Sequence, residues 1–197
     1  MAYDLDRVRV AFVVANRGIE EAELVRPWHA VVDAGGEAEL LAPEQGLAQM
    51  VRRGTPVTRF PVDRATDDAR AADYDAAVLP GGVANADELR TDAAAVDFLM
   101  AMFEAGKLVA AVSHGVSPLI DGDLVSGRTV TSWPSLQTDL RNARAVWVDR
   151  DVVVCRRGIN TLVTSRRPED LGTFCRHLTE ELAPPGGAGV DRRRVMA

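Results

Sequence analysis

The chain has 197 residues and a net charge of −6, and its composition is 47% hydrophobic, 26% charged and 5% aromatic. This balance predicts one globular domain with a sizeable core over residues 1–182. Residues 183–197 are rich in proline, glycine and arginine and can bury little apolar surface, which predicts a flexible tail. The acidic charge argues against a nucleic-acid-binding surface, and apolar stretches of about seven residues are too short to span a membrane. Since the N-terminus has no apolar signal segment, we expect a cytoplasmic protein.

The cysteines and histidines form no pattern that is typical of a metal site. Cys155 and Cys175 are not in a CxxC spacing, and the three histidines are scattered along the chain. This distribution argues against a disulfide framework and against structural zinc. We therefore expect neither a metal nor a cofactor.

The chain begins with a strand–helix–strand pattern. Residues 8–14 form an almost continuous β-branched and apolar run, typical of a parallel strand that is covered on both faces. A helix with one apolar face is predicted over residues 20–34, and Gly35 can end it because glycine accepts the left-handed conformation found there. Residues 38–42 predict a second strand. The short connections favour a right-handed parallel crossover.

The middle of the chain contains the other core strands. Residues 49–62 suggest a small hairpin beside the main sheet. Strands are predicted over residues 76–79 and 108–112. The helix between these strands begins after Asp92, which can cap it, and ends at Gly106.

The last third of the chain completes the predicted domain. Strands are expected over residues 128–132, 152–155 and 161–164, and a helix over residues 168–182 starts with Pro168 in its first turn. This alternation of strands and helices predicts an α/β three-layer domain with a mostly parallel sheet.

Ser113 occupies the position in this pattern where a nucleophile is often found. Ligands of open parallel sheets bind beyond the carboxyl ends of the strands. Ser113 follows the buried strand 108–112 at once, and His114 and Gly115 come next, which is the arrangement of a nucleophile elbow. Ala111 stands where the usual hydrolase elbow has its first glycine. The alternative interpretation is that Ser113 only caps the following helical turn.

Two further loops are expected at the same edge of the sheet. Gly81 and Gly82 follow the third core strand and could present N–H groups to an oxyanion, or they could form only a tight turn. Glu20 lies at the end of the first strand–helix turn. Its carboxylate could face the site, or it could only interact favourably with the helix dipole. The helix dipole explains Glu21 and Glu23 equally well. The GxGxxG pattern is absent from the sequence, which argues against dinucleotide binding.

Seven short motifs follow one another in a characteristic order between residues 7 and 182. They are GIEEAEL at 18–24, LPGG at 79–82, AAVSHG at 110–115, TSWP at 131–134, DLRNA at 139–143, WVD at 147–149 and TSR at 164–166. In this combination the chain resembles the PfpI-type intracellular protease/amidase family. That family lies within the class I glutamine amidotransferase-like superfamily and includes the parkinsonism-associated deglycase.

The resemblance implies a flavodoxin-like sandwich and a site built around a cysteine at the elbow. Glu20 would contact that cysteine, and His114 would be its neighbour. Asp87 of a second subunit would orient the histidine, and the backbone around Gly81, Gly82 and His114 would form the oxyanion site. The resemblance also implies a small-molecule substrate and a homodimer or higher homo-oligomer.

The sequence departs from the family pattern at the decisive position. The family elbow reads ICHGP, whereas this chain has Ser113 in place of the cysteine and Val116 in place of the proline. A free cysteine is partly ionised near neutral pH, but a serine hydroxyl needs an aligned general base. Glu20 could accept the hydroxyl proton only if burial raised its pKa toward neutrality.

Three functions are therefore open. The first is an enzyme acting on small amides or on carbonyl adducts such as glyoxal products, for which we expect Glu20→Gln to abolish turnover. The second is a non-catalytic scaffold that binds a small metabolite or protects against stress. The third is a Ser-His-Asp hydrolase, which needs Nε2 of His114 within about 3 Å of the Ser113 hydroxyl and is disfavoured by their adjacency in sequence.

Overall fold

The computed structural model describes residues 3–184 and shows a three-layer α/β/α sandwich. The tail was predicted to begin at residue 183, and its residues 185–197 lie outside the described residues. The strands are β1 (Arg9–Val13), β2 (Arg17–Glu20), β3 (Glu37–Ala42), β4 (Gly46–Arg52), β5 (Thr55–Val62), β6 (Arg64–Ala65), β7 (Ala76–Leu79), β8 (Leu108–Val112), β9 (Thr129–Val130), β10 (Val146–Trp147), β11 (Val152–Cys155) and β12 (Leu162–Ser165). The α-helices are α1 (Glu21–Asp33), α2 (Val83–Leu89), α3 (Ala93–Glu104), α4 (Ser117–Asp121), α5 (Gln137–Asn142) and α6 (Leu171–Leu182).

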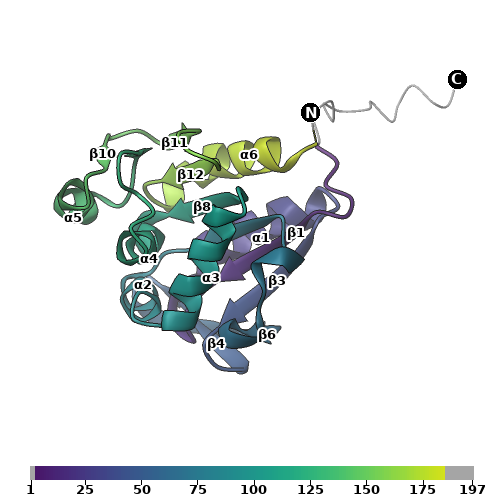
Figure 1. Ribbon diagram of the computed structural model, residues 1–197. Coiled ribbons are helices and arrows are strands. Elements are labelled where there is room, and N and C mark those ends of the chain that lie inside the picture. The colour runs from purple at the N-terminus through teal and green to yellow at the C-terminus, as the bar shows by residue number, and fades with distance from the viewer. Residues whose placement is uncertain (1–2, 185–197) are drawn as a thin grey trace, which may run out of the picture.

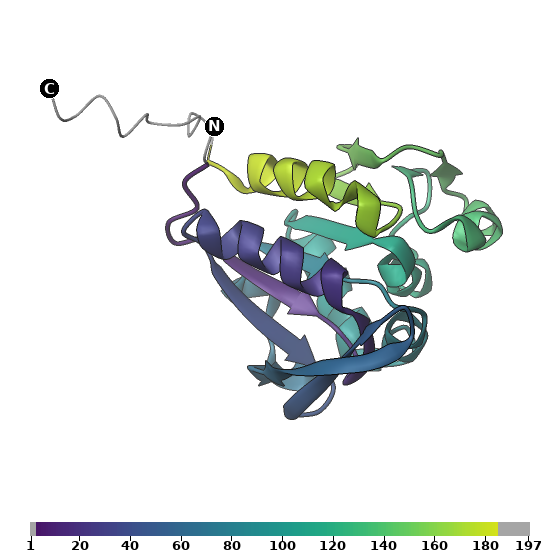
Figure 2. The same ribbon diagram turned by 180° about the vertical axis from the view of Figure 1, so that it is seen from behind.

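The central sheet has the order β11-β12-β8-β7-β1-β3-β6. Its neighbouring strands pair in parallel except β11, which runs antiparallel to β12 at one edge. The helices α1 and α6 cover one face of the sheet, as Figure 2 shows, and α3 covers the other face (Figure 1). The fold class predicted from the sequence, a flavodoxin-like sandwich with a mostly parallel sheet, is confirmed.

Alternate residues of the buried strands supply two separate cores. In β1, Ala11 and Val13 pack on the α3 side, whereas Val10 and Phe12 pack on the side of α1 and α6. This division follows from the two-residue period of a strand, and it explains why β1 is apolar at every position.

Most of the predicted elements are confirmed, with small changes at their ends. The hairpin predicted within residues 49–62 is formed by β4 and β5, which join β2 in a separate three-stranded sheet. The side chain of Asp92 accepts a hydrogen bond from Ala95 N at 2.7 Å and so caps α3 as expected. The strand predicted over residues 128–132 is reduced to β9, and the helix that starts at Pro168 opens with a 3-10 turn before α6.

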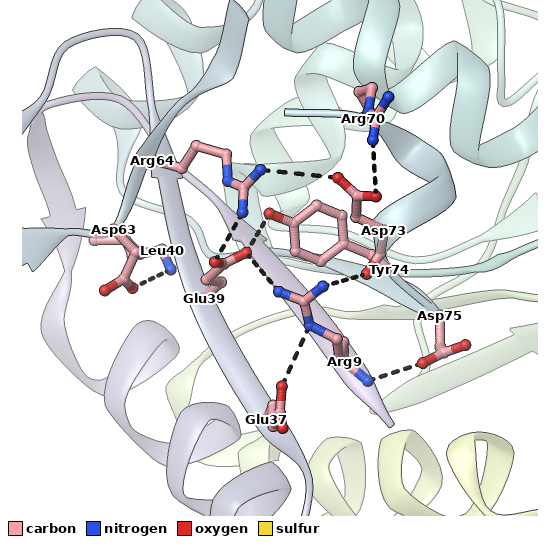
Figure 3. Close-up of polar contacts among 10 residues, drawn as sticks. All are labelled: Arg9, Glu37, Glu39, Leu40, Asp63, Arg64, Arg70, Asp73, Tyr74 and Asp75. Carbon is pink, nitrogen blue, oxygen red and sulfur yellow. Dashed lines mark hydrogen bonds and ion pairs between the residues drawn. The ribbon is translucent and has the colours of Figure 1, made fainter. Parts of the chain in front are cut away.

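A polar network links neighbouring strands at the end of the sheet where β1 and β7 begin (Figure 3). The buried Tyr74 donates its hydroxyl to the carboxylate of Glu39, which also pairs with Arg64 at 3.3 Å and with Arg9 at 3.6 Å. Burial and the neighbouring carboxylate raise the pKa of Tyr74, so its hydroxyl stays a donor. The network ties β1, β3 and β6 together at the edge opposite the strands' carboxyl ends.

Candidate functional site

Ser113 sits at a strained turn directly beyond β8. Its backbone has a φ of +58°, a left-handed conformation that a residue with a Cβ rarely adopts. The residue is only 4% exposed, and it begins the 3-10 turn Ser113–Val116. A strand that turns sharply into a helical turn at a hydroxyl-bearing residue has the geometry of a nucleophile elbow.

The loops around Ser113 approach so closely that only glycine fits at two positions. A Cβ on Gly115 would lie 2.3 Å from the carbonyl oxygen of Leu79. A Cβ on Gly81 would lie 2.2 Å from Oε2 of Glu23 and 2.9 Å from Cβ of Ser113. The structure therefore brings Gly81, Gly115 and Ser113 together, as the convergence of strand ends predicts.

The carboxylic acid beside Ser113 is Glu23. This residue is only 1% exposed, and its Oε2 accepts a hydrogen bond of 2.9 Å from Gly81 N. Burial raises the pKa of Glu23 to about 8, and the nearby charge of Glu20 adds to the rise, while the Gly81 N–H and the Ser113 hydroxyl oppose it. Glu23 is thus mainly protonated at neutral pH and keeps an ionised fraction of roughly a tenth at pH 7.

The prediction that Glu20 contacts residue 113 is wrong. Glu20 precedes α1 in extended conformation, and its carboxylate accepts a hydrogen bond of 3.1 Å from Arg53 N in the β4–β5 hairpin. Glu23 lies within the first turn of α1, on the face that also buries Pro27 and Val31. Its spacing of four and eight residues from these two positions is the sequence signal that could have identified it.

His114 lies between the elbow and the exposed surface. Its Nδ1 is 3.3 Å from the Ser113 hydroxyl, and its Nε2 is 3.3 Å from the hydroxyl of Ser135. The indole of Trp133 stacks on the imidazole, with ring centroids 5.7 Å apart and planes inclined by 28°. Burial lowers the pKa of His114, so the ring is neutral near pH 7 and one nitrogen can accept a hydrogen bond.

This arrangement disfavours a Ser-His-Asp triad within the chain. The nitrogen that contacts Ser113 is Nδ1, whereas Nε2 of His114 contacts Ser135 rather than an acid. Asp87 lies on the exposed side of α2. Its expected contact with a histidine across a subunit interface stays a prediction.

The two glycines expected to bind an oxyanion differ in their surroundings. The Gly81 N–H is committed to Glu23, so it is not free to bind a second group. Gly82 has a φ of +100°, and a Cβ there would lie 2.0 Å from the carbonyl oxygen of Gly18. The N–H groups of Gly82 and His114 stay the predicted oxyanion donors.

Asn85 is a buried residue of the site that sequence reasoning missed. Its Nδ2 donates to the carbonyl oxygens of Pro80 and Gly81 at 3.0 and 3.2 Å, and its Oδ1 accepts from Ala15 N at 2.7 Å. The side chain holds the glycine loop against the end of β1. The sequence signal that could have identified Asn85 was a polar residue on the inner face of α2, the helix that follows the glycines.

Among residues 3–184, no group of three or more His, Cys, Asp or Glu side chains is arranged to hold a metal ion. Within the same residues, no helix combines the length and the apolar character that crossing a membrane requires. The site chemistry of the described residues thus consists of a hydroxyl, a buried carboxylic acid, a neutral imidazole and backbone amides.

Comparison with known proteins identifies relatives along almost the whole chain. The sequence profile of the DJ-1/PfpI family matches residues 8–181. General stress protein 18 of Bacillus subtilis is 37% identical over 164 residues, which are 83% of this chain and 92% of the relative. The deglycase PfpI of Pyrococcus furiosus is 34% identical over 175 residues, which are 89% of this chain and 99% of the relative.

Solved structures give the same result for the fold. The structure of a two-domain protein from Anabaena variabilis, with DJ-1/ThiJ/PfpI-like and ferritin-like domains, matches with a TM-score of 0.82 and 32% identity. The match covers 95% of this chain and 52% of the other, so this chain spans about half the length of that protein. Drosophila melanogaster DJ-1beta matches with a TM-score of 0.78 and 27% identity, over 90% of this chain and 91% of the other.

Proposed function

Since the chain belongs to the DJ-1/PfpI family, we propose that it is an enzyme of small carbonyl or amide substrates in which Ser113 is the nucleophile. The observation that carries the proposal is the strained backbone of Ser113, with a φ of +58°, beside the buried carboxyl group of Glu23. A strained turn persists only where the surrounding structure enforces it, and such turns gather at active sites. The names deglycase and general stress protein, borne by two relatives, fit a substrate of this class.

Glu23 is the general base and acid of the proposed reaction. Its ionised fraction takes the proton of the Ser113 hydroxyl while the oxygen adds to the substrate's carbonyl carbon. With an amide, the protonated carboxyl group then gives the proton to the leaving amine as the carbon–nitrogen bond breaks, and a water molecule activated by the same carboxylate releases the acyl group from Ser113. With an aldehyde, the proton goes to the former carbonyl oxygen of the adduct. A pKa of about 8 suits these proton transfers near neutral pH, because an acid–base catalyst works best when its pKa is close to the working pH.

The negative charge that develops on the carbonyl oxygen needs a donor nearby. The Gly82 N–H is the donor proposed for this oxygen, since the Gly81 N–H already binds Glu23. His114 supports the hydroxyl through Nδ1 and stays neutral because it is partly buried. A second copy of the chain would be needed for Asp87 to take its expected place beside His114, so we also propose a homo-oligomer.

The test compares the wild type with Ser113→Ala and Ser113→Cys for glyoxal consumption and for hydrolysis of small amides. Wild-type turnover that vanishes in Ser113→Ala supports the proposal. Turnover that appears only in Ser113→Cys contradicts it, and the protein is then a binding scaffold whose site lacks its nucleophile.

A further inference from the structure

A cavity of about 450 Å³ runs along the outer edge of the central sheet. All four residues of β11 line it, together with Thr129 and the arginines Arg150, Arg156 and Arg157. Side chains of consecutive strand residues point to opposite faces, so a cavity that touches every residue of β11 must follow the edge of the strand rather than one face. Within residues 3–184, β11 is the last strand of its sheet and forms ladder pairs only with β12, while β9 of the separate two-stranded sheet packs near it (Figure 1).

The charges around the cavity are unusual for a chain with a net charge of −6. Arg156 pairs with Glu181. Among residues 3–184, no carboxylate lies within ion-pair distance of Arg150 or Arg157, and both arginines are exposed. The cavity therefore carries two guanidinium groups whose charge the described chain does not neutralise.

A third cation lies behind the wall of the cavity. Arg128 is only 8% exposed, and its guanidinium contacts the side chain and the carbonyl oxygen of Asn160 and lies 5.0 Å from the ring centroid of Phe103. It adjoins Cys155, which lines the cavity, and no carboxylate pairs with it among the described residues. Buried charges are normally paired, so Arg128 leaves positive potential that an anion in the cavity would offset.

We propose that this cavity binds a small molecule that carries a phosphate group on a short apolar body. The planar guanidinium groups of Arg150 and Arg157 match the geometry of phosphate oxygens, and N–H groups at a sheet edge can add donors. The valines of β11 provide the apolar wall that a small-molecule site of this size requires. The site is separate from Ser113 and does not depend on the proposed reaction.

Calorimetric titration with phenyl phosphate at low ionic strength tests the proposal. We expect saturable binding to the wild type and to Ser113→Ala, and at least a tenfold weaker affinity for Arg150→Gln combined with Arg157→Gln. The matched control combines Arg53→Gln with Arg59→Gln, which removes the same charge from the β4–β5 hairpin and should leave the affinity unchanged.

Two results would overturn the proposal. One is the absence of binding to the wild type at about 10 mM phenyl phosphate. The other is an equal affinity of the two double variants for phenyl phosphate, which would show that arginines in general, and not this cavity, attract the anion. Thermal unfolding of each variant verifies that its fold is intact. Phenol, the uncharged counterpart of the probe, is expected not to bind to the wild type.

Discussion

The Gly81 N–H donates a hydrogen bond of 2.9 Å to Oε2 of Glu23, and this contact joins the loop after β7 to the first turn of α1. The glycine cannot carry a Cβ because that atom would lie 2.2 Å from the same oxygen. The contact places a buried carboxyl group beside Ser113. The same contact occupies the Gly81 N–H, which was predicted from the sequence to bind an oxyanion.

The buried carboxyl group of Glu23 makes stability depend on pH. Its pKa is raised from 4.5 to about 8, so between these values the folded state holds a proton that the unfolded chain has released. This contribution is fully present below pH 4.5 and is lost as the pH rises toward about 8. We expect the free energy of unfolding of the wild type, relative to Glu23→Gln, to fall by at most about 1.4 kcal/mol per pH unit across this window.

Urea unfolding of both proteins at several pH values within the window measures this difference. Using the difference between the two proteins cancels the contributions of other titrating groups. Parallel pH profiles would contradict a raised pKa for Glu23.

Gly81→Ala should separate the two loops of the site. The new Cβ would collide with Glu23 and with Cβ of Ser113, so we expect a loss of roughly 1–3 kcal/mol in the free energy of unfolding. The control is Gly172→Ala in α6, where the nearest atom is 3.9 Å from the added Cβ and helix propensity predicts a small gain. Equal effects of the two substitutions would show that the contact at Gly81 is not tight.

The strain at Ser113 can be measured by two substitutions at the same position. Both Ser113→Gly and Ser113→Ala remove the hydroxyl, but only glycine adopts a φ of +58° without steric cost. We expect Ser113→Gly to be more stable than Ser113→Ala by about 1 kcal/mol in chemical denaturation. If the alanine variant is the more stable of the two, the backbone at Ser113 is not strained.

Ser135 is expected to fix the tautomer of His114. The Ser113 hydroxyl directs its proton toward Glu23, so Nδ1 of the neutral ring carries the hydrogen and donates it to the hydroxyl oxygen, while Nε2 accepts from the Ser135 hydroxyl. Nitrogen-15 NMR of the wild type at pH 7 should show this single tautomer, and Ser135→Ala should give a mixture of both. Thr138→Ala, which removes a neighbouring exposed hydroxyl, is the control. An unchanged spectrum in Ser135→Ala would exclude the role of Ser135.

The buried strands and the elbow could be predicted because their signals are local. The apolar runs of β1, β7 and β8 identify central strands, and the strand ends place Gly81 and Ser113 at one edge. By contrast, β2 was missed because its four residues become a strand only by pairing with β4, some thirty residues later in the chain.

Glu20 was predicted from its position at the strand end and from the family pattern, but which glutamate faces inward depends on where α1 begins. Each helical residue turns by about 100°, so an error of one or two residues in the start changes which side chain faces the sheet. Glu20 lies just before the helix and turns to Arg53, whereas Glu23 faces inward. Burial, which gives Glu23 its raised pKa, is a property of the folded structure and has only a weak signal in the local sequence.

The most direct test of the account compares kcat/KM for Glu23→Gln and Glu20→Gln, with the substrate that the wild type converts. If Glu23 moves the proton of Ser113, Glu23→Gln loses about 10²- to 10⁴-fold, and Glu20→Gln stays within a few-fold of the wild type. Full activity in Glu23→Gln, or a large loss confined to Glu20→Gln, would contradict the account.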